Sequence, residues 1–159
     1  IAMILEGYTR SNLQCKLLVV GNLTTDYGRK MEANYGKDPR IIFTGGIYDL
    51  QQLNNLRYFS RYYFHGHSVG GTNPSLLEAM ASGAFIIAHG NEFNEAILGE
   101  DARYFGDAGM LSRLLNQPIL DEKVRSAAIE NNFRKVKEIY NWDLIAAGYE
   151  ELFLKLLNR

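Results

Sequence analysis

The chain has 159 residues, 47% of them hydrophobic, and a domain of this length buries about two thirds of the surface that its unfolded chain exposes. Its 17 Lys and Arg residues nearly balance its 18 Asp and Glu residues, so no overall field attracts it to nucleic acid or to an anionic membrane. The single cysteine, Cys15, excludes an internal disulfide framework and a zinc site built from cysteine alone, and it fits a reducing, cytoplasmic compartment.

Short apolar runs alternate with helix-length segments along most of the chain. Residues 1–8 carry apolar side chains at helical spacing, and the next apolar run, 15–21, ends at a glycine as a buried parallel strand does. Further strands are predicted at 40–46, 61–64, 84–88 and 102–105, and further helices at 26–35, 49–59, 74–83, 91–98 and 107–116. Pro118 prevents the last of these helices from continuing.

Helices are predicted for the rest of the chain. Apolar residues mark one face of 121–140, Asn141 interrupts the pattern, and 142–157 is the clearest amphipathic helix of the sequence. We expect this last helix to pack its apolar face on the core, an interpretation that we prefer to a membrane-surface helix. No apolar run has the length that is needed to span a bilayer.

Alternating strands and helices predict an α/β fold that forms a single domain over residues 1–159. We expect a Rossmann-like parallel sheet of about five strands with helices on both faces, ending in a long C-terminal helix. Ligands of such sheets bind at the carboxyl ends of the strands. Predicted strands are followed by Gly21, Gly45 and Gly46, by residues 65–72 and by residues 89–91, so these positions should converge on one crevice.

The loop and helix start within residues 65–83 form the strongest candidate for a binding site. Pro74 suits the first position of a helix, where its missing N–H costs nothing, and Asn73 or Thr72 can cap the turn. Unpaired N–H groups and the positive end of the helix dipole favour an anion there, which indicates a phosphate-bearing nucleotide. The loop has neither the Walker pattern nor GxGxxG, so an ordinary strand-to-helix connection is the alternative.

Acidic and imidazole side chains near this loop are further candidates. Glu78 lies one turn into the helix, where its carboxylate either accepts hydrogen bonds from ribose hydroxyls or merely complements the helix dipole; spacing does not decide between these roles. His65 and His67 should face one side of an extended strand end, and His89 closes the neighbouring strand. We interpret the histidines as packing or hydrogen-bonding groups and expect no metal site.

Residues 74–88, PSLLEAMASGAFIIA, resemble the C-terminal, donor-binding half of the retaining family 4 glycosyltransferases, which have two Rossmann-like domains (the GT-B class). The resemblance extends to 43–47, 94–99 and 140–142, and so covers nearly the whole chain. It implies that the helix start binds the donor diphosphate, that Glu78 holds the ribose, and that Gly46 and Ile47 contact the nucleobase. It also implies a reaction that needs neither a metal nor a cofactor, because the nucleotide sugar is the substrate.

The family commonly carries two glutamates separated by seven intervening residues, and the position that matches the first is Gly70 here. Residues 66–74, GHSVGGTNP, instead resemble a branch described as rhamnosyltransferases. This implies a donor such as dTDP-rhamnose, or a UDP-linked sugar; a deoxyribose has no 2′-hydroxyl, which would halve the hydrogen bonds open to Glu78. The residues expected to hold the donor diphosphate and sugar are His67, Gly70, Gly71, Thr72, Asn73, Pro74 and Ser75.

The same resemblance implies parts of the enzyme outside these 159 residues. The chain begins at Ile1 without a start methionine, so we expect a fragment that lacks the N-terminal acceptor domain and the first, central strand of the sheet. Either neighbouring strands close that gap or another chain fills it. The catalytic residues and the saccharide acceptor site would lie largely in the absent domain, and the fragment alone should transfer no sugar and bind nucleotide weakly.

The implied setting is surface polysaccharide synthesis in the cytoplasm, with peripheral association at the inner face of the membrane and a homo-oligomer among the expected assemblies. Two rival hypotheses remain. A sugar-nucleotide epimerase or a phosphorylase-like enzyme shares the architecture, and a Rossmann-like interaction domain without catalysis is favoured by the glycine at position 70. Nucleotide binding separates the last of these from the enzymes.

Overall fold

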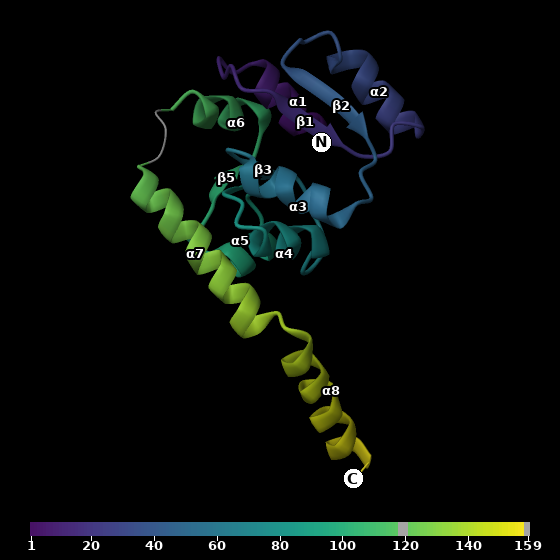
Figure 1. Ribbon diagram of the computed structural model, residues 1–159, viewed down its shortest axis with the longest axis vertical. Coiled ribbons are helices and arrows are strands. Elements are labelled where there is room, and N and C mark those ends of the chain that lie inside the picture. Colours follow the sequence, from purple (N-terminus) through teal and green to yellow (C-terminus); the bar gives the residue numbers. More distant parts are fainter. Residues whose placement is uncertain (118–120, 158–159) are drawn as a thin grey trace.

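The computed structural model describes residues 1–117 and 121–157, which form strands flanked by helices (Figure 1). Pro118, expected to stop a helix, lies outside the described residues. The strands are β1 (Leu17–Val20), β2 (Ile41–Gly45), β3 (Tyr63–His65), β4 (Ile86–His89) and β5 (Arg103–Phe105). The helices are α1 (Ala2–Thr9), α2 (Asp26–Tyr35), α3 (Leu50–Phe59), α4 (Pro74–Ala81), α5 (Glu92–Leu98), α6 (Ala108–Leu115), α7 (Glu122–Ile139) and α8 (Trp142–Leu157).

All the strand pairs are parallel, but the strands form two sheets. One sheet joins β1 to β2, with Leu17 opposite Ile41, and the other has the order β3-β4-β5. The predicted α/β fold with parallel strands is therefore confirmed, whereas the expectation of about five strands in one sheet is corrected to sheets of two and three strands. The sheets are separate because a space lies between β1 and β3, and no backbone hydrogen bonding pairs these two strands in the described residues.

Side chains that cap helices fix the starts of most of these elements. In the described residues, six N-cap residues each accept a hydrogen bond from a backbone N–H of the first turn: Thr25, Asp49, Asn73, Asn91, Asp107 and Asp121. Such a cap contributes about 1 kcal/mol to helix stability. Because capping is local, the sequence predicts these helix starts to within a residue.

The core is built on both faces of β4. Phe85 and Ile87 pack in a cluster with α1 and α6, whereas Ile86 and Ala88 pack in a second cluster with α4 and α5. The four side chains are at most 3% exposed, which is why the run 84–88 is continuously apolar in sequence. Helices on both faces of the sheet are therefore confirmed.

The two C-terminal helices differ in how they meet this body. Helix α7 packs against α4, whereas α8 extends away from the rest of the chain (Figure 1) and has no buried residue. Trp142 is 82% exposed and Leu157 is 81% exposed. The expectation that 142–157 packs on the core is therefore wrong, because none of the described elements covers its apolar face. Among the described residues, no helix has both the length and the apolar character to cross a membrane.

Gly7 gives a test of the packing between α1 and α6. A Cβ added at Gly7 would lie 2.8 Å from the carbonyl oxygen of Ala108 and 2.9 Å from Cβ of Leu111. Gly148 on α8 has no atom within 4 Å of its Cβ position, so Gly148→Ala is a matched control with the same gain in helix propensity. We expect Gly7→Ala to be less stable than Gly148→Ala by about 1 to 3 kcal/mol in urea unfolding. Equal stability of the two variants would contradict this packing.

Candidate functional site

The loop between β3 and α4, residues 66–73, is closed by a cap that the sequence predicts. Oδ1 of Asn73 accepts hydrogen bonds from the Ser75 N–H (3.0 Å) and from the Ser75 hydroxyl (2.8 Å). The backbone carbonyl of Asn73 accepts from the N–H groups of Leu76 (3.0 Å) and Leu77 (3.2 Å). Pro74 occupies the first turn, where it has no N–H to satisfy. Asn73, and not Thr72, is therefore the cap.

This cap changes which N–H groups are open to an anion. The first-turn N–H groups of α4 are already used within the chain, whereas those of Gly70, Gly71, Thr72 and Asn73 make no hydrogen bond among the described residues. Gly70, Gly71 and Thr72 are also exposed. The open donors therefore lie in the loop that precedes the helix, still at the positive end of its dipole.

Gly70 has a backbone that favours glycine. Its φ is +102°, and a Cβ there would meet no atom within 4 Å, so the constraint comes from the backbone alone. For other residues the left-handed region costs about 1 to 2 kcal/mol. A glutamate at this position, which the resembled glycosyltransferases commonly carry, would therefore be strained by this backbone conformation.

Two asparagines tie this loop to the end of β4. The carbonyl oxygen of His67 accepts hydrogen bonds from Nδ2 of Asn91 (3.0 Å) and Nδ2 of Asn94 (3.1 Å), and Asn94 also donates to the carbonyl of His89 (2.8 Å). The expected convergence of residues 65–72 and 89–91 is confirmed for these positions. Asn94, which is 4% exposed, is not among the site residues that the sequence predicts; an amide on the buried side of a helix is the signal that could have identified it.

His65 and His67 face the same side, as their spacing predicts. Their rings stack with centroids 4.7 Å apart. His65 is 1% exposed, and its Nε2 has no hydrogen-bond partner among the described residues. Burial first, and the charge of His67 second, lower the pKa of His65 to about 4, so this imidazole is neutral at neutral pH. The described residues contain no group of three or more His, Cys, Asp or Glu side chains arranged to share a metal.

Glu78 is held by an arginine from another helix. Oε2 of Glu78 accepts from Nη2 of Arg57 at 2.6 Å, and Nη1 of Arg57 donates to Oδ1 of Asn54 at 3.0 Å. The Arg57 side chain is 6% exposed and that of Glu78 is 46% exposed, so a buried cation fixes one oxygen of a carboxylate whose other oxygen has no partner in the described chain. Arg57 is not among the site residues that the sequence predicts, although it follows Leu53 by four residues on the apolar side of its helix.

Gly46 and Ile47 lie in the connection between β2 and α3. The ring of Tyr48 lies over Gly46, where a Cβ would come within 2.8 Å of the tyrosine hydroxyl. No hydrogen bond joins Gly46 or Ile47 to the loop 66–73 in the described part of the chain. Their contact with a nucleobase remains a prediction from the resemblance.

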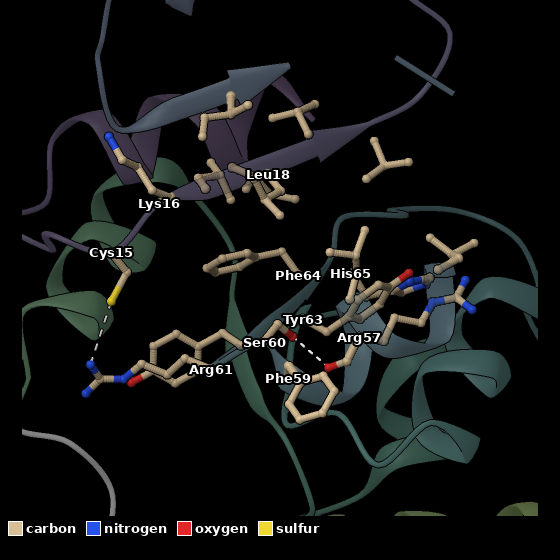
Figure 2. Close-up of a pocket in the computed structure, with 18 of the residues that line it drawn as sticks. Cys15, Lys16, Leu18, Arg57, Phe59, Ser60, Arg61, Tyr63, Phe64 and His65 are labelled. Atoms are coloured by element: carbon tan, nitrogen blue, oxygen red, sulfur yellow. Dashed lines mark hydrogen bonds between the residues drawn. The ribbon is translucent and has the colours of Figure 1, made fainter. Parts of the chain in front are cut away.

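A cavity of about 1350 Å³ lies beside this loop, between β1 and β3. Figure 2 shows Leu18 of β1 on one side of it and Tyr63, Phe64 and His65 of β3 on the other. Arg57 and Ser75 also line it. The cavity and the candidate nucleotide site therefore share residues.

Solved structures of similar fold exist. The chain matches crystal structures of Anabaena Alr3699/HepE in complex with UDP (TM-score 0.80, 16% identity) and in complex with UDP-glucose (TM-score 0.78, 15% identity), covering 97% of this chain and 44% of that one. It also matches sucrose-phosphate synthase from Thermosynechococcus elongatus (TM-score 0.76, 18% identity), covering 98% of this chain and 43% of that one.

These similarities establish a shared fold. The chain spans less than half the length of each of these proteins. No protein-family model matches the sequence, and no curated protein matches it at a significant level.

The buried neutral His65 predicts a pH dependence of stability. The unfolded chain binds a proton at this residue below about pH 6.5, whereas the folded chain binds it only near pH 4. Stability should therefore fall as pH decreases from 6.5 toward 4, by about 2 to 3 kcal/mol for this residue. We expect urea unfolding at pH 7 and pH 4.5 to show that loss in the original chain.

Two variants isolate the contribution of this histidine. His65→Phe removes the proton-binding group and should lose less stability over the same pH range, whereas His89→Gln, which replaces a half-buried histidine, should keep the loss. An identical pH dependence in the original chain and in His65→Phe would show that His65 is not buried in its neutral form.

Proposed function

We propose that this chain is the donor-binding domain of a glycosyltransferase that takes its sugar from a nucleoside diphosphate. The observation that carries this proposal is the row of open N–H groups at residues 70–73, followed one helical turn later by the Glu78 carboxylate. Backbone N–H groups at the start of a helix bind phosphate oxygens. A carboxylate with one free oxygen accepts a hydrogen bond from a ribose hydroxyl. The two features together suit the diphosphate and the ribose of one ligand.

The ion pair with Arg57 gives Glu78 a fixed orientation. Because Arg57 is buried and hydrogen bonded to Asn54, the carboxylate loses little further freedom when a ligand binds. A hydrogen bond to a charged group contributes about 1.5 to 3 kcal/mol. Glu78 therefore contacts the ribose from helix α4, and the more exposed loop 66–73 contacts the phosphates.

The proposed reaction is metal-independent transfer with retention of configuration, to a saccharide acceptor that other parts of the enzyme bind. The open N–H groups would stabilise the charge that develops on the departing diphosphate, because their orientation is set before the reaction. A rhamnosyl donor, and a role in surface polysaccharide synthesis, follow from the resemblance of residues 66–74. Support for a nucleotide-sugar ligand comes from the similar fold of HepE, whose crystals contain UDP and UDP-glucose.

Isothermal titration calorimetry with UDP and dTDP tests the assigned role of Glu78. We expect Glu78→Gln to weaken UDP binding by about tenfold or more, since the neutral amide loses a charge-assisted hydrogen bond. The effect on dTDP should be smaller, because its sugar lacks the 2′-hydroxyl. Glu92→Gln is a matched control, since Glu92 is an exposed acid in the first turn of α5.

Two results would contradict this assignment. If neither nucleotide binds at millimolar concentration, the chain would be better described as an interaction domain without catalysis. If Glu78→Gln and Glu92→Gln weaken binding equally, Glu78 acts through general charge and not through a ribose contact.

Addition of EDTA should leave binding unchanged in a metal-independent site.

The adjacent glycines Gly70 and Gly71 test whether the conformation of loop 66–73 determines nucleotide binding. Gly70→Ala places a side chain at φ +102°, whereas Gly71→Ala adds the same methyl group in open space at a residue without positive φ. We expect Gly70→Ala to weaken UDP binding several-fold more than Gly71→Ala, since about 1 to 2 kcal/mol of backbone strain would redirect the open N–H groups. The same titration measures both variants, and equal affinities would mean that the loop conformation does not determine binding.

A further inference from the structure

The loop between β3 and α4 is anchored at two points, with an exposed segment between them. At its start, the carbonyl oxygen of His67 accepts two hydrogen bonds from side chains, and at its end Asn73 caps α4. Residues 68–72 make no hydrogen bond among the described residues, and all of them are exposed. The conformation of this segment therefore depends on its two anchors.

The anchor at His67 is built from two asparagine amides. Asn91 donates from Nδ2 at 3.0 Å and Asn94 donates from Nδ2 at 3.1 Å. Nδ2 of Asn94 also donates to the carbonyl of His89 at 2.8 Å. One buried amide thus joins the carboxyl ends of β3 and β4, beyond the last paired residues of these strands. A buried amide that is hydrogen bonded to both strand ends has a fixed position.

These hydrogen bonds fix the peptide group between His67 and Ser68. A trans peptide is planar, and its N–H points opposite to its C=O. Because the His67 carbonyl faces the two asparagines, the N–H of Ser68 is directed away from them, and rotation of this peptide would break both hydrogen bonds. The chain therefore leaves the anchor in a set direction, two residues before the positive φ of Gly70.

Helix α5 gives this anchor a firm support. Oδ1 of Asn91 caps the helix by accepting from the N–H groups of Phe93 (3.1 Å) and Asn94 (3.0 Å). Further along α5, Ile97 and Leu98 are buried in the same cluster as residues of α4. The anchor at the start of the loop and the helix at its end therefore belong to one packed unit.

We propose that Asn91 and Asn94 are positioning residues of the nucleotide site. Through the carbonyl of His67 they hold residues 68–72, so that the N–H groups of residues 70–73 are oriented for a phosphate before the ligand binds. Less conformational freedom is then lost on binding. Neither asparagine has to touch the ligand. The inference rests on the proposed function, because it assigns the two side chains a role at the same site.

Two neutral substitutions remove the anchor. Asn94→Leu keeps a side chain of similar size and removes both of its donated hydrogen bonds. Asn91→Ser removes the amide donor, and serine is as good an N-cap as asparagine. Because neither substitution changes the charge, attraction to a phosphate is unaltered. Asn91 is only half-buried, so Asn91→Ser provides the test if Asn94→Leu does not fold.

Asn141→Ser is the matched control. Nδ2 of Asn141 donates to the carbonyl of Lys137 at 2.9 Å, and its Oδ1 accepts from the N–H of Leu144 in the first turn of α8. It therefore combines a helix cap with a donated hydrogen bond, as Asn91 does. Helix α8 extends away from the rest of the chain (Figure 1), so this substitution leaves the loop untouched.

The experiment measures UDP affinity by calorimetry at a temperature where thermal unfolding shows each variant to be folded. We expect Asn94→Leu and Asn91→Ser each to weaken UDP binding by about threefold to tenfold. The double variant should lose more than the product of the two single effects, because either amide alone still holds the carbonyl. Without ligand, ¹⁵N relaxation should show increased motion of residues 68–72. Asn141→Ser should change neither quantity.

The inference is overturned if the folded double variant binds UDP as tightly as the original chain. It is equally overturned if the variants lose thermal stability while affinity and loop relaxation stay unchanged, since the asparagines would then have only a structural role. In both cases the original chain still binds UDP and the proposed function stands. If the original chain binds no UDP at millimolar concentration, the proposed function fails, and the inference fails with it.

Discussion

The structure depends on β4, which among the described strands is the one that is paired at both edges, and whose two faces are both covered by helices. Its edges pair with β3 and β5, and its alternate side chains enter separate helix-covered clusters. The position of β3, and with it the start of the loop 66–73, depends on this one paired edge. The other edge of β3 faces the cavity beside β1.

The candidate nucleotide site shares residues with the cavity that lies between the two sheets. Arg57 contributes to both, because its guanidinium holds Glu78 and the residue also lines the cavity. His65 ends β3 and stacks on His67, whose carbonyl is fixed by Asn91 and Asn94.

Local signals in the sequence predict much of this structure. The run 84–88 is apolar throughout because both of its faces are buried, and Asn73, Asn91 and Asp107 identify helix starts because a cap bonds only to its own first turn. The loop with Asn73, Pro74 and Ser75 is predicted for the same reason. These features need no knowledge of distant residues.

Features that join distant residues are not predictable in this way. The Arg57–Glu78 pair spans 21 residues, and the division into two sheets depends on which strand edges meet. For α8, hydrophobic periodicity identifies an apolar face but not what covers it, so the expectation of core packing fails there. Gly70 resembles a flexible spacer in sequence, whereas its φ of +102° makes it a specific constraint on the loop.

The most direct test of the proposed donor site is an NMR titration of the ¹⁵N-labelled chain with UDP. The account predicts that the backbone amides of Gly70, Gly71, Thr72 and Asn73 shift together and saturably, with smaller shifts near Glu78 and none in α8. Inorganic phosphate should move the loop amides but not those near Glu78. Saturable shifts elsewhere, with the loop amides unchanged, would contradict the account.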